Sequence, residues 1–422
     1  MDLTRRLAQL DALLKGPRPP AGPDVPAPLP ATPGDPAVLE RVVAALGLTA
    51  REATGGEAWA CDAVEPAPCP PPEPATLAAL AALLAPRGAA AALPGAVTDA
   101  PAPSAAGGLL LLDTETTGLA GGTGTVPFLI GCAWWEEGTL RTRQWFLPTP
   151  GREGPLLADL AAHARRFSVV VTYNGQTFDL PLLRTRALLA RQPDPVAGLH
   201  GWDLLRAARR LWGRRLPDCR QSTVEAQVCG IARDSDDLPG ALIPQVYFRW
   251  LRAGDAGDLP RVLAHNRRDL RGMAAILAAA GTRAADLGAL PPAGAASAWP
   301  WADLWSAGRI CERQGRRDLA AAWLAVALAT RDGGAPERFF ADAVRVFKRS
   351  EAWSDAATAL AVALAAVGER PWLHREAAIL YEHRLRDLPL AHAHAQRLGE
   401  PARLARLARK LGRSGPAAPA GA

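Results

Sequence analysis

The sequence predicts an α/β domain, a mixed β-sheet flanked by helices, followed by an all-α region of helical hairpins. The run LLLLDTETTGL at 109–119 is apolar and ends in acids and turn residues, which is typical of a buried strand. A hairpin of strands and then alternating helical and β-branched segments follow it, an order that suits a mixed sheet. After about residue 295 the β-rich segments stop, and Ala, Leu and Arg recur at helical spacing.

The predicted elements from residue 109 onward run strand, strand, strand, helix, strand, helix. A Gly-rich loop, GLAGGTGTVP, follows the leucine strand, and FLIGCAWW and TLRTRQWFL on either side of EEG read as a hairpin. GPLLADLAAHARRF has the spacing of an amphipathic helix, and SVVVTYNG is a β-branched strand that ends in a turn dipeptide. Pro181 suits the first turn of the next helix, so we expect Asp179 at or just before its N-terminus.

Composition limits the broad class of protein. The 422 residues suffice for two or three domains, and the net charge of +6 is compatible with a polyanionic partner but too small to establish one. Six scattered cysteines without a C-x-x-C pair indicate reduced thiols in a cytoplasmic protein. The N-terminus lacks the pattern of a signal peptide, and no segment approaches the length that spans a membrane.

Residues 1–105 form a Pro/Ala-rich N-terminal region. Proline at this density blocks regular elements and favours extended chain. We expect short helices near 3–14, 37–46 and 75–86 with poorly ordered links between them. The sequence of this region does not indicate a function.

The C-terminal region, residues 300–411, contains a repeat. Segments of similar sequence align at Ala321, Ala356 and Ala391, which lie 35 residues apart. That period belongs to helix-hairpin repeats of the tetratricopeptide kind, in which small residues let paired helices approach closely. An Ala-rich helical bundle without true repeats is the alternative. We expect residues 412–422 to be a disordered tail.

Acidic residues mark the candidate site. Asp113 and Glu115 are two residues apart on the predicted strand, so both carboxylates point to the same face of the sheet. They repel each other there unless a divalent metal lies between them. A D-x-E that merely runs into a polar loop is the alternative. Asp179 follows a strand expected beside the first one, although it could serve only as a helix cap. His265 and Asp269 lie four apart on one helix and share a face, but such a pair is also common on protein surfaces.

Together these motifs resemble those of the YprB-like ribonuclease H-like domain family, within the DEDD superfamily of 3′-5′ exonucleases. D-x-E, N-G-x-x-F-D and H-N-x-x-D occur in the order of the three exonuclease motifs, and the resemblance covers about residues 107 to 280. Five stretches carry it: LDTETTGL at 112–119, TGTVPFLIG at 123–131, YNGQTFDLPLL at 173–183, the LPG to LR stretch at 238–252 and HNRRDL at 265–270. The resemblance implies a ribonuclease H-like exonuclease domain at 106–290.

The resemblance also implies a mechanism. Asp113, Glu115, Asp179 and Asp269 would hold two Mg²⁺ or Mn²⁺ ions roughly 4 Å apart, which activate water and stabilise the leaving oxygen. His265 would accept the proton of the attacking water. In the two common subtypes of the superfamily a His stands five residues before the last Asp or a Tyr four before it, whereas this chain has His at the spacing of the Tyr.

The substrate that the resemblance implies is nucleic acid, either DNA or RNA, degraded from the 3′ end of a single strand. Asn174 and the backbone near Thr114 and Thr116 would position the terminal nucleotide. Two other kinds of residue could contact it but have structural alternatives: arginines could track phosphates or form a solvated helix face, and tryptophans could stack on bases, although core packing is favoured. These residues are Arg206, Arg209, Arg210, Arg214, Arg215 and Arg220, and Trp134, Trp135, Trp145, Trp202 and Trp212.

Two other functions compete with a metal-dependent exonuclease. The domain could bind nucleic acid without cutting it, or the helical repeats could act as a scaffold for a protein partner. Mutation of Asp113 separates the three functions. It should abolish nucleotide release by an exonuclease, leave the nucleic-acid affinity of a binding module largely intact, and not affect the capture of a protein partner by a scaffold.

Overall fold

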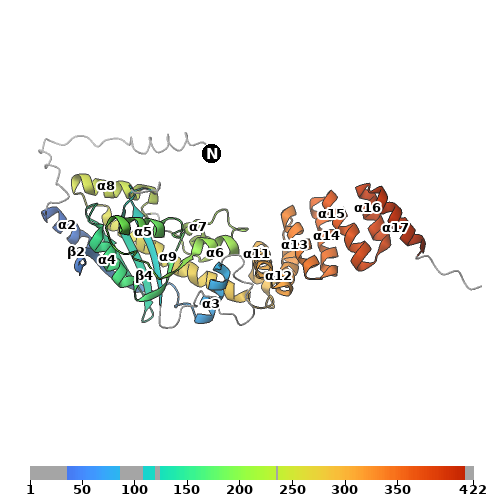
Figure 1. Ribbon diagram of the computed structural model, residues 1–422, viewed down its shortest axis with the longest axis horizontal. Helices are drawn as coiled ribbons and strands as arrows, with labels where there is room; N and C mark the ends of the chain where they lie inside the picture. The colour runs from blue at the N-terminus through green and yellow to red at the C-terminus, as the bar shows by residue number, and fades with distance from the viewer. Residues whose placement is uncertain (1–35, 86–107, 119–123, 234–235, 414–422) are drawn as a thin grey trace, which may run out of the picture.

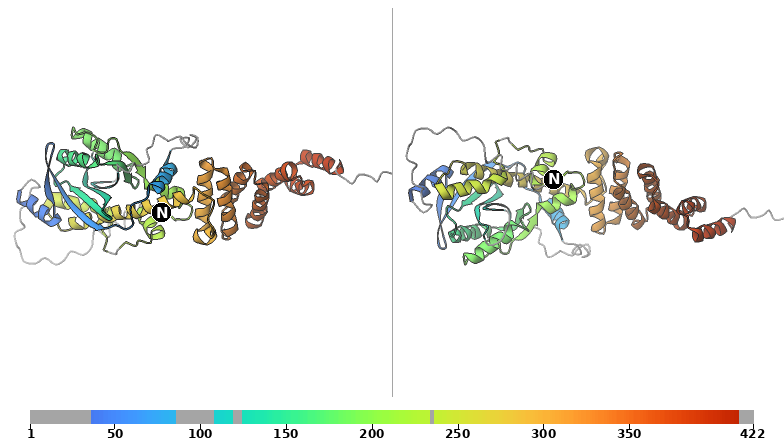
Figure 2. Two further views of the ribbon diagram at one scale, coloured as in Figure 1. Left: turned by 90° about the horizontal axis from the view of Figure 1, so that it is seen from below. Right: turned by 90° about the horizontal axis from the view of Figure 1, so that it is seen from above.

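The computed structural model describes residues 36–85, 108–118, 124–233 and 236–413. A seven-stranded mixed sheet with helices on both sides forms one end of the molecule, and helices α11 to α17 run away from it in a row (Figure 1; Figure 2). The predicted fold class is confirmed. The predicted helix near 3–14 lies outside the described residues.

The sheet has the strand order β1-β2-β5-β4-β3-β6-β7. Strand β6 runs parallel to β3 and β7 runs parallel to β6, whereas the other neighbours are antiparallel. The expectation that the SVVVTYNG strand lies beside the leucine strand is therefore confirmed. The strands are β1 (Thr49–Ala53), β2 (Gly56–Pro66), β3 (Gly108–Thr116), β4 (Pro127–Glu136), β5 (Thr139–Phe146), β6 (Phe167–Thr172) and β7 (His200–Asp203).

The N-terminal region differs from the prediction of isolated helices with poorly ordered links. Two of the expected helices are present, but the segment between them forms the β1–β2 hairpin, and β2 extends the sheet by pairing with β5. The sequence ATGGEAWACDAV contains the turn glycines and the β-forming residues of this hairpin. Prolines on either side of the hairpin obscured that pattern, and one of them, Pro66, is the last paired residue of β2.

The helices of this half are α2 (Pro36–Leu46), α3 (Pro74–Leu84), α4 (Glu153–Ala164), α5 (Asp179–Leu189), α6 (Leu204–Leu211), α7 (Gln221–Val228), the short 3₁₀ turn η2 (Gly240–Leu242), α8 (Ile243–Ala253), α9 (Leu259–Asp286) and α10 (Ala295–Ala298). Successive residues of β3 face opposite sides of the sheet. Leu109 and Leu111 pack in a core that includes α3, α6 and most of α9, whereas Leu110 and Leu112 pack in a core that includes α2, α4, α5 and α8. The same alternation holds at the end of β3, where it decides which side of the sheet the acidic residues face.

The remaining helices are α11 (Trp301–Arg313), α12 (Arg317–Thr330), α13 (Glu337–Arg349), α14 (Trp353–Val367), α15 (Pro371–Leu380), the π-helical turn η3 (Tyr381–Leu385), α16 (Leu388–Leu398) and α17 (Pro401–Arg413). They form successive pairs, α11 with α12, α13 with α14 and α15 with α16. Ala356 and Ala391 are fully buried in these pairs, whereas in α12 Ala320 is buried in place of Ala321. The tetratricopeptide assignment stays a prediction, and α17 extends past the expected end of the helical region at 411.

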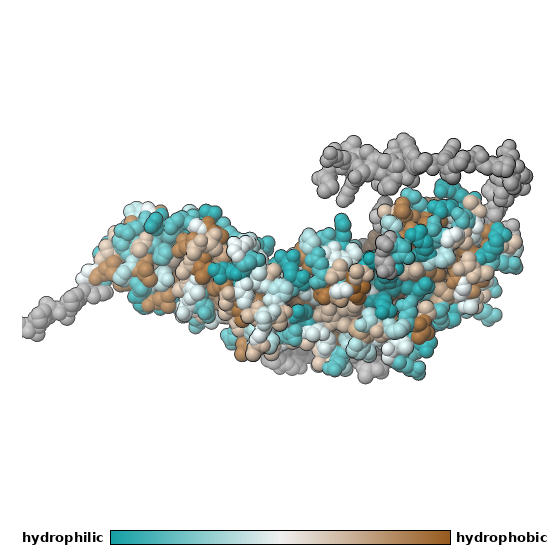
Figure 3. All heavy atoms as spheres, turned by 180° about the vertical axis from the view of Figure 1, so that it is seen from behind, coloured by the Kyte–Doolittle hydropathy of each residue, from teal (hydrophilic) through white to brown (hydrophobic). Residues whose placement is uncertain are grey.

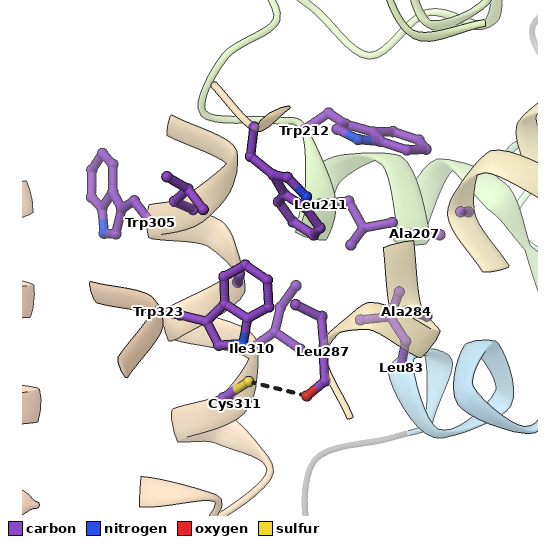
Figure 4. Packing of buried hydrophobic residues seen from close by; sticks show 14 of the residues in the cluster. Leu83, Ala207, Leu211, Trp212, Ala284, Leu287, Trp305, Ile310, Cys311 and Trp323 are labelled. Atoms are coloured by element: carbon purple, nitrogen blue, oxygen red, sulfur yellow. Dashed lines mark hydrogen bonds between the residues drawn. The ribbon is translucent and has the colours of Figure 1, made fainter. Parts of the chain in front are cut away.

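A continuous apolar core joins the sheet half to the helical half. Leu211 and Trp212 beside α6, Leu287 after α9, and Trp305 of α11 belong to one buried cluster, and the Sγ of Cys311 donates to the carbonyl oxygen of Leu287 at 3.7 Å (Figure 4). Since the core does not stop between residues 290 and 300, the predicted division into separate domains there stays a prediction.

Three of the six arginines proposed to track phosphates make contacts within the protein instead. Arg215 donates through Nε to both carboxylate oxygens of buried Asp303 at 3.0 Å, and Arg214 lies over the ring of Trp305 with its guanidinium carbon 4.6 Å from the centroid. Arg210 donates to the carbonyl oxygen of Leu83. These arginines connect α6 and the turn after it to α11 and α3, so neither of the two roles considered from the sequence applies to them.

Among the described residues, no helix is both long enough and apolar enough to cross a membrane. On the face drawn in Figure 3, apolar residues are scattered in small groups among hydrophilic ones. The six cysteines are free thiols.

Candidate functional site

Strand β3 ends at the carboxylates of Asp113 and Glu115. Both are half-buried, whereas Thr114 and Thr116 between and after them are buried. Because alternate residues share a face, Asp113 and Glu115 follow Leu109 and Leu111 toward α9. The D-x-E therefore lies at the boundary between the sheet and a helix, and not in a splayed polar loop.

Helix α9 brings His265 and Asp269 to the same place. Nε2 of His265 lies 3.4 Å from Oδ2 of Asp269, one turn further along the helix. One ligand atom from each of Glu115, His265 and Asp269 lies within 4.8 Å of the other two. The four-residue spacing, which departs from the common superfamily pattern, therefore places the imidazole next to the carboxylates.

Asp179 reaches the site from the other side of the sheet. It is the first residue of α5, and its carboxylate accepts a hydrogen bond from the hydroxyl of Thr114, which faces α5. A Cβ on Gly175 would lie 2.5 Å from Cβ of Thr172 and 2.8 Å from Oδ2 of Asp179, so a larger residue there would displace the side chain of Thr172, the carboxylate or both. Thr114 thus bridges the two faces and holds the third acid beside the first two.

The carboxylic acids of the cluster are buried close together, and this raises their pKa values. Loss of hydration is the largest cause that raises the pKa of Asp113 well above its usual value, followed by the charges of Asp269, Glu115 and Asp179. The same causes, burial first and then Asp269 and Asp179, raise the pKa of Glu115 well above its usual value. Burial also raises the pKa of Asp179 to about 6, against the hydrogen bond from Thr114, and raises the pKa of Asp269.

A carboxylate–histidine pair orients the imidazole. Nδ1 of His265 and Oδ1 of Asp237 are 2.9 Å apart. Burial works against the charged form of Asp237, yet the hydrogen bond from His265 and nearby arginines lower the pKa of Asp237. Because an ionised carboxylate only accepts hydrogen bonds, Nδ1 of His265 donates to Asp237, and Nε2 is the ring nitrogen that faces Asp269.

One guanidinium lies among the carboxylates. Nη2 of Arg233 donates to Oδ1 of Asp269 at 2.5 Å, and Nε donates to Oε2 of Glu225 in α7 at 2.9 Å. Glu225 is buried and also accepts from Gln221 at 2.8 Å. The sequence does not predict the roles of Arg233, Asp237 and Glu225, because isolated charges in a loop and a short helix carry no pattern that links them to Asp269.

The donor set fits divalent metal. Hard cations such as Mg²⁺ and Mn²⁺ prefer carboxylate oxygens, and four acids from β3, α5 and α9 gather here. Burial raises the pKa of all four, and the charges of the neighbouring acids of the cluster raise the pKa values of Asp113 and Glu115 further. Arg233 compensates only one of the four acids directly. Asp113, Glu115, Asp179 and Asp269 are the residues that would hold such ions.

The residues predicted to position a nucleotide have different surroundings. Asn174 is exposed, has a left-handed backbone with φ of 68°, and its N–H donates to Asp203 at 2.9 Å. Thr116 donates to the carbonyl oxygen of Gly118 at 2.9 Å. Asp203 caps α6 by accepting a hydrogen bond from the N–H of Leu205. Of the five tryptophans singled out in the sequence, Trp135, Trp145, Trp202 and Trp212 pack in or against the cores, and buried Trp134 lies against the rings of His163 and Phe167.

Similarity to known proteins agrees with this architecture. A family model of the RNase_H superfamily matches residues 110–280. Those residues form a ribonuclease H-like domain. The match covers less than half of the chain, and it contains every acid of the cluster together with His265, Arg233 and Asp237.

A curated relative matches the same part of the chain. The uncharacterized protein YprB of Bacillus subtilis (strain 168) is 40% identical over 163 residues, which is 38% of this chain and 39% of YprB. The chain thus spans well under half the length of the relative it matches. The ribonuclease H-like domain has a nuclease-type fold, and its chemistry is argued below from the site.

Proposed function

We propose that the protein is a metal-dependent nuclease that hydrolyses phosphodiester bonds, acting as a 3′-5′ exonuclease on single-stranded DNA or RNA. The observation that supports this most is the convergence of four carboxylates on one edge of a ribonuclease H-like sheet, with an oriented imidazole beside them. Neither a structural role nor simple nucleic-acid binding requires acids to be crowded in this way, because crowded acids repel both each other and phosphate.

Each residue has a part in the proposed reaction. Asp113, Glu115, Asp179 and Asp269 would hold two Mg²⁺ or Mn²⁺ ions, which supply charge stabilisation to the phosphodiester and lower the pKa of water. Nε2 of His265 accepts the proton of the attacking water, while the bond from the phosphorus to the 3′ oxygen of the preceding nucleotide breaks. The products are a nucleoside 5′-monophosphate and a strand shortened by one residue.

Two features support a histidine base at the present spacing. The hydrogen bond from Nδ1 to Asp237 leaves Nε2 as the acceptor, and that atom points at the carboxylate cluster. Asp237 also accepts from Arg268 at 2.5 Å, which fixes the orientation of its carboxylate. Asn174, exposed after β6, remains the proposed contact to the terminal nucleotide.

The test is nucleotide release from single-stranded DNA and RNA labelled at the 3′ or the 5′ end, with Mn²⁺ or Mg²⁺. Wild type should release mononucleotides from the 3′ label, and Asp113→Ala and Asp269→Ala should not. Asp194→Ala is the matched control, because Asp194 pairs only with surface Arg184 among the salt bridges of the described residues, and it should cut like wild type.

The remaining results decide against the proposal in different ways. Release of internal fragments from both labels would replace the exonuclease mode by endonuclease cleavage. If wild type and both variants bind the oligonucleotides equally and release nothing, the domain is a binding module and hydrolysis is excluded.

A further inference from the structure

Three residues on neighbouring strands form a row beneath α9. In the register of the sheet, Asp113 of β3 pairs with Gly131 of β4, and Gly131 pairs with Gln144 of β5. The central position of the row has no side chain. A gap therefore lies between the carboxylate of Asp113 and the amide of Gln144.

Asn266 of α9 fills this gap. Its Oδ1 lies 1.9 Å from the place that a Cβ on Gly131 would take, so any residue larger than glycine at 131 excludes the side chain of Asn266 from its present position. Asn266 is fully buried and Gln144 is 1% exposed. A polar amide at such a place must have its hydrogen bonds satisfied by the protein.

Hydrogen bonds determine which way both amides point. Nε2 of Gln144 donates to the carbonyl oxygen of Leu263 at 2.9 Å, and Oε1 accepts from Nη1 of Arg267 at 2.9 Å. Nε2 of Gln144 also donates to Oδ1 of Asn266 at 2.7 Å. The amide nitrogen of Asn266 is consequently directed at Asp113, and it donates to Oδ2 of that carboxylate at 2.8 Å.

We propose that Asn266, admitted by Gly131 and oriented by Gln144, is a positioning residue that holds the Asp113 carboxylate ready to bind a divalent cation. The inference rests on the proposed metal-dependent function. A hydrogen bond to Oδ2 fixes the rotation of the carboxylate, and Asn266 leaves its other oxygen available to a cation. Outer contacts of this kind commonly change metal affinity by about 10- to 100-fold when they are removed.

The experiment measures Mn²⁺ binding to the full chain by calorimetry, without substrate. Asn266→Ala should weaken binding by about tenfold or more. Gly131→Ala should weaken it similarly, because the new Cβ displaces Asn266. Gln144→Met keeps the size of the side chain but removes its amide, and it should weaken binding less than Asn266→Ala.

The double variant Gly131→Ala/Asn266→Ala gives the sharpest result. If Gly131 acts by admitting Asn266, the added methyl occupies space that the alanine at 266 has vacated, and its one remaining close contact is with the end of the Leu270 side chain, whose Cδ1 lies 2.9 Å from the new Cβ and can shift. The double variant should then bind Mn²⁺ no worse than Asn266→Ala alone. Multiplied losses would overturn the proposal. Gly108→Ala in β3 is the control, since its Cβ would meet only the ring of Phe167 at ordinary contact distance and should leave binding unchanged.

Two comparisons separate failure of this inference from failure of the proposed function. If Asp113→Ala binds Mn²⁺ like wild type, the metal site itself is wrong and the inference fails with it. If Asp113→Ala loses binding while Asn266→Ala and Gly131→Ala keep wild-type affinity and the fold by circular dichroism, only the positioning role is excluded. Should Gly131→Ala fail to fold, Asn266→Ala and Gln144→Met still decide the question.

Discussion

Asp179→Asn should stabilise the metal-free protein while abolishing its response to metal. Burial, with a smaller contribution from the charge of Asp203, raises the pKa of Asp179 from 3.8 to about 6, so keeping this carboxylate charged in the fold above that pH costs about 3 kcal/mol. Asparagine removes the charge and keeps an oxygen that can accept from Thr114. The variant should therefore gain up to about 3 kcal/mol of unfolding free energy at pH 8 in EDTA.

The sign of the pH dependence is part of this prediction. Because the pKa of Asp179 is raised in the fold, its contribution to stability is fully present below its ordinary pKa of 3.8 and is lost as the pH rises through about 6. The advantage of Asp179→Asn should thus be near zero at pH 4 and complete above pH 7.

Thermal unfolding in EDTA, followed across this pH range, is the assay. If residues 110–280 unfold as one unit, the full effect corresponds to a rise in Tm of about 6–12 °C. Saturation of the wild type with Mn²⁺ at a thousand times its Kd should add about 4.1 kcal/mol and reverse the order of the two proteins, since the variant lacks a ligand.

A surface acid provides the control for Asp179→Asn. Asp194→Asn changes a carboxylate that pairs with exposed Arg184, and it should leave Tm nearly unchanged at every pH. The reasoning is refuted if Asp179→Asn lowers Tm in EDTA at pH 8, or raises it equally at pH 4 and pH 8.

Three further variants test the surroundings of the site and the junction. Arg233→Gln removes the positive charge that contacts Asp269, so Mn²⁺ affinity measured by calorimetry should rise about tenfold, and a fall would show that Arg233 supports the ligand instead. Asp237→Asn should lower kcat about 10- to 100-fold while Mn²⁺ affinity changes by less than about twofold, because the orientation of the His265 imidazole is lost; equal kcat would exclude this role. Arg215→Ala leaves buried Asp303 without its partner and should destabilise the protein by about 3–5 kcal/mol in denaturant unfolding, whereas exposed Arg220→Ala should have no effect.

Much of the fold was predictable because it depends on local periodicity. Alternating and continuous apolar runs located β3, β4, β5 and β6, and Pro181 indicated where α5 begins. The β1–β2 hairpin was missed because nearby prolines dominated the composition of a window that also contains a short, regular strand pair. The roles of Arg214 and Arg215 were misread because a sequence shows that they are charged but not that they contact Trp305 and Asp303, about 90 residues away.

By itself, the sequence determined that Asp113 and Glu115 share one side of a strand and that His265 and Asp269 share one side of a helix. These relations follow from the repeat of the backbone within a single element. Only the tertiary structure decided that Asp179 meets the cluster from the opposite face through Thr114, that Arg233 contacts Asp269, and that Asn266 reaches Asp113 over Gly131. Contacts of this second kind join segments far apart in the chain, and they depend on how the helices pack on the sheet, which no local spacing encodes.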